Sequence, residues 1–156
     1  MAKATPKYWL IKSEPGTFSI DDLKQAGREC WDGVRNYQAR NHMRDMQVGD
    51  LALFYHSNAD PPGVAGVARV CREAYPDVTQ FDRRSKYYDP KATKDNPRWF
   101  MVDFEFVEKL PELVSLETLK ATHALEGMLV IRRGMRLSVQ PVDKKHFERV
   151  RKLGGA

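Results

Sequence analysis

The feature that most constrains the fold is a pair of apolar segments, residues 51–56 and 63–70, separated by a short polar loop. The first is a continuous apolar run with a polar end, which is typical of a buried strand. The second is rich in valine, alanine and glycine, and its glycines permit strong curvature or close backbone packing. Together the two segments predict a hairpin of the kind found in small barrels.

Further strand and helix signals lie on both sides of this hairpin. β-Rich or alternating segments predict strands at residues 8–13, 30–31, 98–107 and 134–141. Capping residues before helically spaced apolar positions predict helices that begin at Ser19, Asn36, Ser115 and Asp143. The polar stretch 75–97 predicts a long loop. Residues 128–133 form a short apolar element whose secondary structure the sequence leaves open.

The connections between these elements decide the expected fold class. Several are long enough for parallel crossovers, so the sheet should be mixed. We therefore expect an α+β fold: a mixed β pseudo-barrel of five to six strands, decorated by short helices. The chain of 156 residues suits one domain, which we expect at 8–154 after a disordered leader at 1–7.

The composition limits which cellular compartments and which classes of partner we expect. No apolar run approaches the length of a membrane helix, and no signal-peptide pattern is present. Cys30 and Cys71 lack zinc-ligand spacing, so we expect a cytoplasmic monomer in a reducing setting, with no metal, cofactor or membrane partner. The net charge of +5 is compatible with an anionic partner. Because the cations are scattered, the fold would have to assemble any anion-binding surface.

Residues 31–41 hold the densest group of candidate binding side chains. Trp31 precedes an Asp-Gly turn, and the cap of the following helix, Asn36, lies among two arginines and a second asparagine. A helix N-terminus favours negative or acceptor-rich ligands. The alternative interpretation is that Trp31 belongs to the core and the arginines form a solvated face.

Aromatic residues at turns and loops indicate a ligand with a flat ring. A ring at the Trp31 turn and another in the long loop could sandwich a base, and such stacking contributes about 1–3 kcal/mol per base. The amides of Asn36 and Asn41 suit a base edge, and Ser13 can supply a hydroxyl. Other aromatics, Trp9, Phe54 and Phe100, are expected in the core.

Catalytic signals are weak by comparison. The four histidines lie in different elements and share no metal-ligand spacing, and residues 63–66 lack a dinucleotide-binding pattern. Glu14 and His56 could form an acid–base couple if their strand ends meet. A pair of this kind more often holds a pocket in shape.

Several multi-residue blocks resemble the EVE domain family of the PUA-like superfamily. The blocks occur in the family's order at residues 8–15, 31–41, 54–57, 63–66, 74–77, 88–92 and 96–99. The related YTH domains read methylated adenine in RNA through an aromatic cage. The resemblance implies a PUA-like barrel with a pocket for a modified base in DNA or RNA. Ser13 and Trp31 look like the ligand-contacting serine and the cage tryptophan, and Tyr87 or Tyr88 lies in the loop of the second cage wall.

These observations favour a non-catalytic module that recognises a modified nucleobase in a nucleic acid. The expected pocket residues are Ser13, Glu14, Trp31, Arg35, Asn36, Tyr37, Asn41, Phe54, His56, Tyr88 and Trp99. The expected phosphate-contacting residues are Lys12, Arg35, Arg40 and Lys86. Two alternatives stay open: an enzyme that acts on a modified base or nucleotide through Glu14 and His56, and a protein-interaction module.

Overall fold

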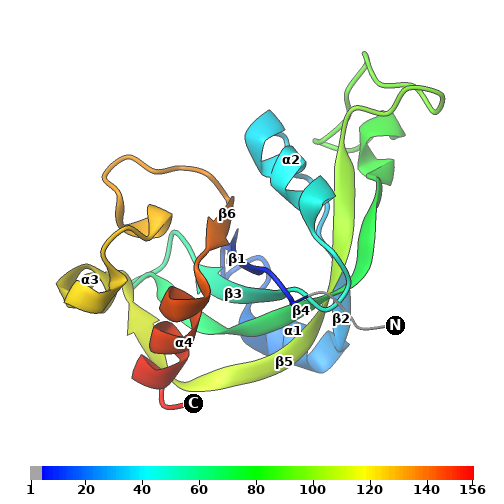
Figure 1. Cartoon of the computed structure of the whole chain (residues 1–156). Helices are drawn as coiled ribbons and strands as arrows, with labels where there is room; N and C mark the ends of the chain where they lie inside the picture. The colour runs from blue at the N-terminus through cyan, green and yellow to red at the C-terminus, as the bar shows by residue number, and fades with distance from the viewer. Residues whose placement is uncertain (1–4) are drawn as a thin grey trace.

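The computed structural model describes residues 5–156, which fold around one six-stranded mixed sheet (Figure 1). The strands are β1 (Tyr8–Ser13), β2 (Arg28–Cys30), β3 (Leu51–His56), β4 (Gly63–Pro76), β5 (Phe100–Ser115) and β6 (Val139–Val142), in the spatial order β2-β5-β4-β3-β1-β6. Only the β1–β3 pair is parallel among the described strands. The predicted mixed α+β fold is confirmed, although the outer strands β2 and β6 do not pair with each other within residues 5–156.

Helices begin where the capping residues predict them. The helices are α1 (Ile20–Ala26), α2 (Tyr37–Asp45), α3 (Leu116–Ala121) and α4 (Lys144–Leu153). The side chains of Ser19, Asn36 and Ser115 each accept a hydrogen bond from a backbone N–H in the first turn, which satisfies a donor that the helix itself cannot pair. Asp143 precedes α4 without such a bond.

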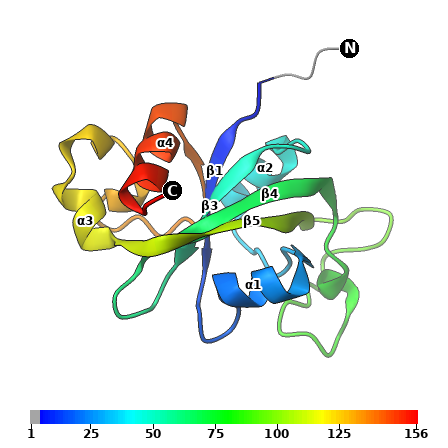
Figure 2. The same cartoon turned by 90° about the horizontal axis from the view of Figure 1, so that it is seen from below.

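The sheet has a hydrophobic core on each face because successive strand residues point in opposite directions. On β1, Trp9 and Ile11 belong to one core and Leu10 to the other. Buried residues of α1 and α2 join the Trp9 core, whereas those of α3 and α4 join the Leu10 core. The helices consequently gather at two ends of the molecule, with α3 and α4 together and α2 apart from them (Figures 1 and 2).

β4 and β5 are longer than the sequence predicts. They span Gly63–Pro76 and Phe100–Ser115, where we predicted strands at 63–70 and 98–107. Four register shifts bend the pair along its length. Gly63 and Gly66 permit close approach, since a Cβ would lie 2.4 Å from the carbonyl oxygen of Val114 at the first and 2.5 Å from that of Glu108 at the second. The extended pair carries residues 77–99 at the end of the molecule where α2 lies (Figure 1).

Other boundaries also differ from the predictions. The expected loop 75–97 contains the end of β4 and a 3₁₀-helix, η1 (Val78–Phe81), and the apolar element at 128–133 contains η3 (Leu129–Ile131). A second 3₁₀-helix, η2 (His123–Leu125), follows α3. The predicted strand at 134–141 is wrong over its first five residues, because Gly134 turns the chain at a φ of 76°.

The predicted core aromatics have mixed outcomes. Trp9 and Phe54 are buried, whereas Phe100 is only half-buried and its neighbour Trp99 is buried instead. Residues 1–4 of the predicted disordered leader lie outside the described residues. Within the rest of that segment, Lys7 donates its backbone N–H to Asp50. No helix in the part of the chain from residue 5 onward has the length and apolar character needed to cross a membrane.

Candidate functional site

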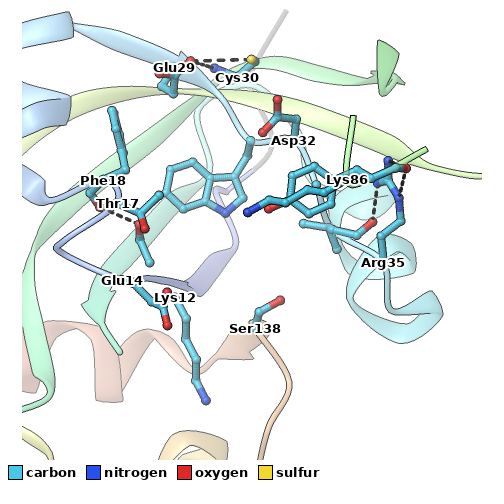
Figure 3. A pocket seen from close by; sticks show the side chains of 15 residues that line it. Lys12, Glu14, Thr17, Phe18, Glu29, Cys30, Asp32, Arg35, Lys86 and Ser138 are labelled. Carbon is cyan, nitrogen blue, oxygen red and sulfur yellow. Dashed lines mark hydrogen bonds between the residues drawn. The ribbon is translucent and has the colours of Figure 1, made fainter. Parts of the chain in front are cut away.

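A cavity of about 500 Å³ opens where the end of β1 meets the turn after β2 and the 77–99 segment (Figure 3). Its lining residues are Lys12, Ser13, Glu14, Thr17, Phe18, Glu29, Cys30, Trp31, Asp32, Gly33, Val34, Arg35, Lys86, Tyr87 and Ser138. This volume falls within the range of about 300–1,000 Å³ that is usual for ligand pockets. The cavity therefore has room for a nucleobase-sized group.

Trp31 forms a half-buried wall of the cavity that is supported from behind. Phe18, Phe54 and Phe104 meet its indole edge-to-face, with ring centroids 6.2, 5.6 and 5.5 Å away. Its backbone N–H donates to the carbonyl of Val102 on β5 at 2.7 Å. The indole N–H of Trp31 has no hydrogen-bond partner within residues 5–156, so it is available to a ligand acceptor.

Tyr87 forms a second aromatic wall, and Gly33 makes room for it. A Cβ on Gly33 would lie 2.6 Å from Cζ of the Tyr87 ring, closer than any real side-chain contact. The φ of Gly33 is +77°, a conformation that also favours glycine. The turn after Trp31 thus requires glycine at position 33 for two reasons: its backbone has a positive φ, and the ring of Tyr87 occupies the space of a side chain.

Arg35 holds the Tyr87 wall to the turn. Its guanidinium donates twice to the Tyr87 carbonyl, at 3.1 and 2.7 Å, and also to the Val34 carbonyl, Asp77 and Thr79. Arginine has five N–H donors, and all five are engaged. Arg35 therefore has no free N–H donor for the phosphate contact that the sequence predicts. Its side chain instead positions Tyr87.

Asp77 joins the parts of this turn. Its carboxylate is fully buried and accepts hydrogen bonds from the Gly33 N–H, the Arg35 guanidinium, and the N–H and hydroxyl of Thr79. Burial alone would raise the pKa of Asp77, but the hydrogen bonds from Thr79, Gly33 and Arg35 outweigh it and lower the pKa. The ionised carboxylate thus fixes both Gly33 and Arg35.

Polar groups line the cavity between its aromatic walls. Asp32 lies on one side, and Lys12, Glu14 and Ser138 lie on the opposite side (Figure 3). Desolvation, followed by the charges of Asp77 and Glu29, raises the pKa of the Asp32 carboxyl. Desolvation lowers the pKa of Lys12, whose ammonium donates to the Met135 carbonyl at 3.3 Å.

The same lining offers little for covalent or acid–base catalysis. Desolvation, with the charges of Asp32 and Glu29, raises the pKa of the Cys30 thiol to about 11, so it is a poor nucleophile at neutral pH. His56 Nε2 accepts from the backbone N–H of Ile20 and Glu14 accepts from Asn58, so the expected Glu14–His56 couple is not formed. Within residues 5–156, no group of three or more histidine, cysteine or acidic side chains could hold a metal ion.

The structure brings together part of the predicted site. Ser13, Glu14, Trp31, Arg35, Lys12 and Lys86 line the cavity. Eight predicted residues lie outside its lining: Asn36, Tyr37, Arg40, Asn41, Phe54, His56, Tyr88 and Trp99. Their contacts explain this, since Asn36 caps α2, Phe54 is buried behind Trp31, and Tyr37 stacks on Trp99. Of the two loop tyrosines, Tyr87 and not Tyr88 lines the cavity.

Sequence reasoning missed several lining residues. They are Thr17, Phe18, Glu29, Cys30, Asp32, Gly33, Val34 and Ser138. Asp32 lies inside the block 31–41, where the sequence pattern indicates only a turn. Ser138 comes from a segment predicted to be a strand, and no local signal places it near Ser13. The bond from Lys12 to Met135 shows how the fold brings these segments together.

Comparison with known proteins identifies the family of this fold and cavity. The family model described as EVE domain matches residues 7–153. The chain belongs to the EVE domain family. A curated relative, human thymocyte nuclear protein 1, is 43% identical over 170 residues, which cover 97% of this chain and 75% of the human protein.

Solved structures of similar proteins share this architecture over almost the whole chain. A hypothetical protein from Leishmania major superimposes with a TM-score of 0.92 at 49% identity, covering 97% of this chain and 96% of that one. Human THYN1 in complex with 5-methylcytosine-containing DNA superimposes with a TM-score of 0.89 at 43% identity, covering 96% and 98%. A member of the family therefore binds DNA that carries a modified base.

Proposed function

We propose that this EVE protein is a non-catalytic module that binds nucleic acid and takes a modified base into the Trp31–Tyr87 cavity. The observation that carries the proposal is the pair of aromatic walls, one of which has an indole N–H without a partner among the described residues. The human relative in complex with 5-methylcytosine-containing DNA supports modified cytosine in DNA as the first candidate. Stacking between the walls would contribute about 1–3 kcal/mol per base.

The polar lining complements a cytosine edge. Cytosine presents an exocyclic amine as a donor, and carboxylates such as those of Asp32 and Glu14 accept from it. The Ser13 hydroxyl already donates to the Phe18 carbonyl, so toward a ligand its oxygen can only accept. The Trp31 indole N–H and the ammonium groups of Lys12 and Lys86 remain as donors for the acceptors of the base and its phosphates.

A binding module fits the chemistry of the lining better than an enzyme does. The Cys30 thiol is held protonated, and Glu14 and His56 have separate partners. A methyl group that enters the cavity would contribute about 0.8 kcal/mol per buried carbon. Recognition of the modification by shape should therefore be modest, and loss of a polar partner should weaken binding more.

A titration with matched oligonucleotides tests the proposal. Single and double strands that carry 5-methylcytosine, other modified bases or no modification are titrated by the fluorescence of the aromatic walls. The expected result is tighter binding of a modified strand. The reaction mixtures are then analysed by mass spectrometry, where we expect no product. Equal affinity for all strands would contradict recognition of the modification, and a new product would contradict the non-catalytic function.

A further inference from the structure

An aromatic and arginine-rich surface adjoins the cavity on the side of Tyr87. The Arg35 guanidinium carbon lies 5.4 Å from the Tyr87 ring centroid and 5.3 Å from that of Trp99. Trp99 is only 6% exposed and donates its indole N–H to Asp89 at 2.7 Å. Tyr37, which is 47% exposed, stacks on Trp99 at 4.8 Å with an interplanar angle of 22°. A continuous series of contacts thus leads from the cavity wall to the surface.

Three arginines lie on this aromatic support, and we name Arg40, Arg44 and Arg98 the arginine row. The guanidinium carbons of Arg40 and Arg98 lie 4.8 and 5.8 Å from the Tyr37 ring centroid, and that of Arg44 lies 4.7 Å from the Phe100 centroid. Arg40 and Arg44 are four residues apart on α2, so they share one face of the helix. The aromatic rings hold these cations in defined places.

The arginine row retains donors and charge that Arg35 does not. Arg40 donates only to neutral oxygens, the Arg98 carbonyl and Asn41 Oδ1, through three of its five N–H groups. The side chain of Arg44 forms no hydrogen bond or ion pair with residues 5–156. The nearest carboxylate to the row is that of Asp89, 3.7 Å from Arg98. Free guanidinium donors beside a stacked tyrosine suit phosphate oxygens, which guanidinium groups bind in bidentate fashion.

We infer that the arginine row binds the sugar-phosphate backbone next to the base held in the cavity, so that the flanking strand crosses α2. This inference rests on the proposed function. The inference also defines the path of the strand, which would leave the cavity past Tyr87. Exposed cations also precede Ser138 in the sequence, among them Arg132 and Arg136, and would carry a strand that left on the Ser138 side of the cavity.

Salt dependence of binding tests the inference. In R40Q/R44Q, the slope of log affinity against log salt concentration should become shallower by about 1.4 on single strands, at about 0.7 per lost phosphate contact. Modified and unmodified strands should weaken by the same factor, since the cavity is intact. The matched control is K120Q/R149Q, which removes two exposed charges from α3 and α4, away from α2 (Figures 1 and 2). Its slope should equal that of the wild type.

Two further variants separate the possible outcomes. R40K/R44K keeps both charges and should retain the wild-type slope. R44Q alone removes a guanidinium that has no hydrogen bond within residues 5–156, so this variant should stay folded even if R40Q/R44Q does not. A slope that changes in R132Q/R136Q and not in R40Q/R44Q or R44Q would overturn the inference. A wild type with no preference for modified strands would refute the proposed function instead, whatever the slopes.

Discussion

Trp31 and Trp99 show two different uses of the same side chain. Trp99 is buried, its indole N–H is paired with Asp89, and Tyr37 covers its ring. Trp31 is half-buried, its N–H has no partner within the described residues, and its ring borders a cavity. Trp9 follows the Trp99 pattern, since its N–H donates to Asp50. An indole whose ring and donor are both satisfied serves the fold, whereas one with both available can serve a ligand.

The largest predicted effect separates these two uses. Trp99→Ala should lower the free energy of unfolding by about 3–5 kcal/mol, because it leaves a cavity and removes one of the hydrogen-bond donors to Asp89. Trp31→Ala should lower it less, because the side chain is half-exposed, but should abolish binding of the modified base. Urea denaturation and oligonucleotide titration measure the two effects. If Trp31→Ala did not fold, or if the folded variant bound normally, the binding role of Trp31 would be contradicted.

Asp77→Asn tests whether the second wall depends on a buried charge. The substitution should lower the free energy of unfolding by about 2–3 kcal/mol at pH 7, since it weakens hydrogen bonds to an ionised group. The folded pKa of Asp77 is depressed, so its contribution is present above about pH 4 and is lost as the pH falls toward the folded pKa. The stability difference between wild type and Asp77→Asn should therefore shrink below pH 4. A difference that is constant with pH would show that the charge contributes nothing.

Gly33→Ala should have a smaller effect on stability and a clear effect on binding. Its positive φ should reduce the free energy of unfolding by about 1–2 kcal/mol, and the new Cβ should displace Tyr87. Gly134→Ala is the matched control, because Gly134 has a φ of 76° but no atom within 4 Å of an added Cβ. Gly33→Ala should lose at least as much stability as Gly134→Ala, because it adds the contact with Tyr87 to the same cost of positive φ, and only Gly33→Ala should bind the modified strand more weakly. Equal binding by the two would argue against Tyr87 as a wall.

The smallest predicted effect concerns Glu14, which is exposed at the rim and bonded to Asn58. Glu14→Gln should change the preference between bases by about 0.5–1.5 kcal/mol, since a carboxylate only accepts hydrogen bonds and an amide also donates them. Competition between labelled strands measures this preference. If Glu14 instead acted as a catalytic acid or base, the variant would keep its preference and lose turnover.

Local signals in the sequence predict the elements but only part of the cavity. Ser19 and Asn36 identify helix starts because a cap acts within one turn of its own position. Ser13 and Trp31 could be placed in the site because strand ends and turns are also local features. The choice of Tyr87 over Tyr88 could not, because it depends on the space above Gly33 and on Arg35, more than 50 residues away along the chain.

Arg35 and Asp77 show a second limit of sequence reasoning. From its charge alone, Arg35 suits a phosphate, and only the positions of Asp77, Thr79 and Tyr87 show that its donors are already engaged. Asp77 lies in a polar stretch that predicts a long loop, yet its side chain is fully buried. The extension of β4 past residue 70 brings that stretch beneath the Trp31 turn, and this long-range packing has no signature in the local pattern.

The wide sequence separation of the Arg35 contacts also links ligand recognition to cooperative folding. Arg35 and Tyr87 are 52 positions apart, so the second wall exists only after the chain between them has closed. An unfolded or partly folded chain therefore offers a ligand no complete binding site. A ligand that binds the native state alone shifts the unfolding equilibrium by mass action, by about 2.7 kcal/mol at a concentration one hundred times its Kd. The melting temperature of the whole protein thus becomes a sensor of occupancy, through which libraries of modified nucleosides and oligonucleotides can be ranked without a label.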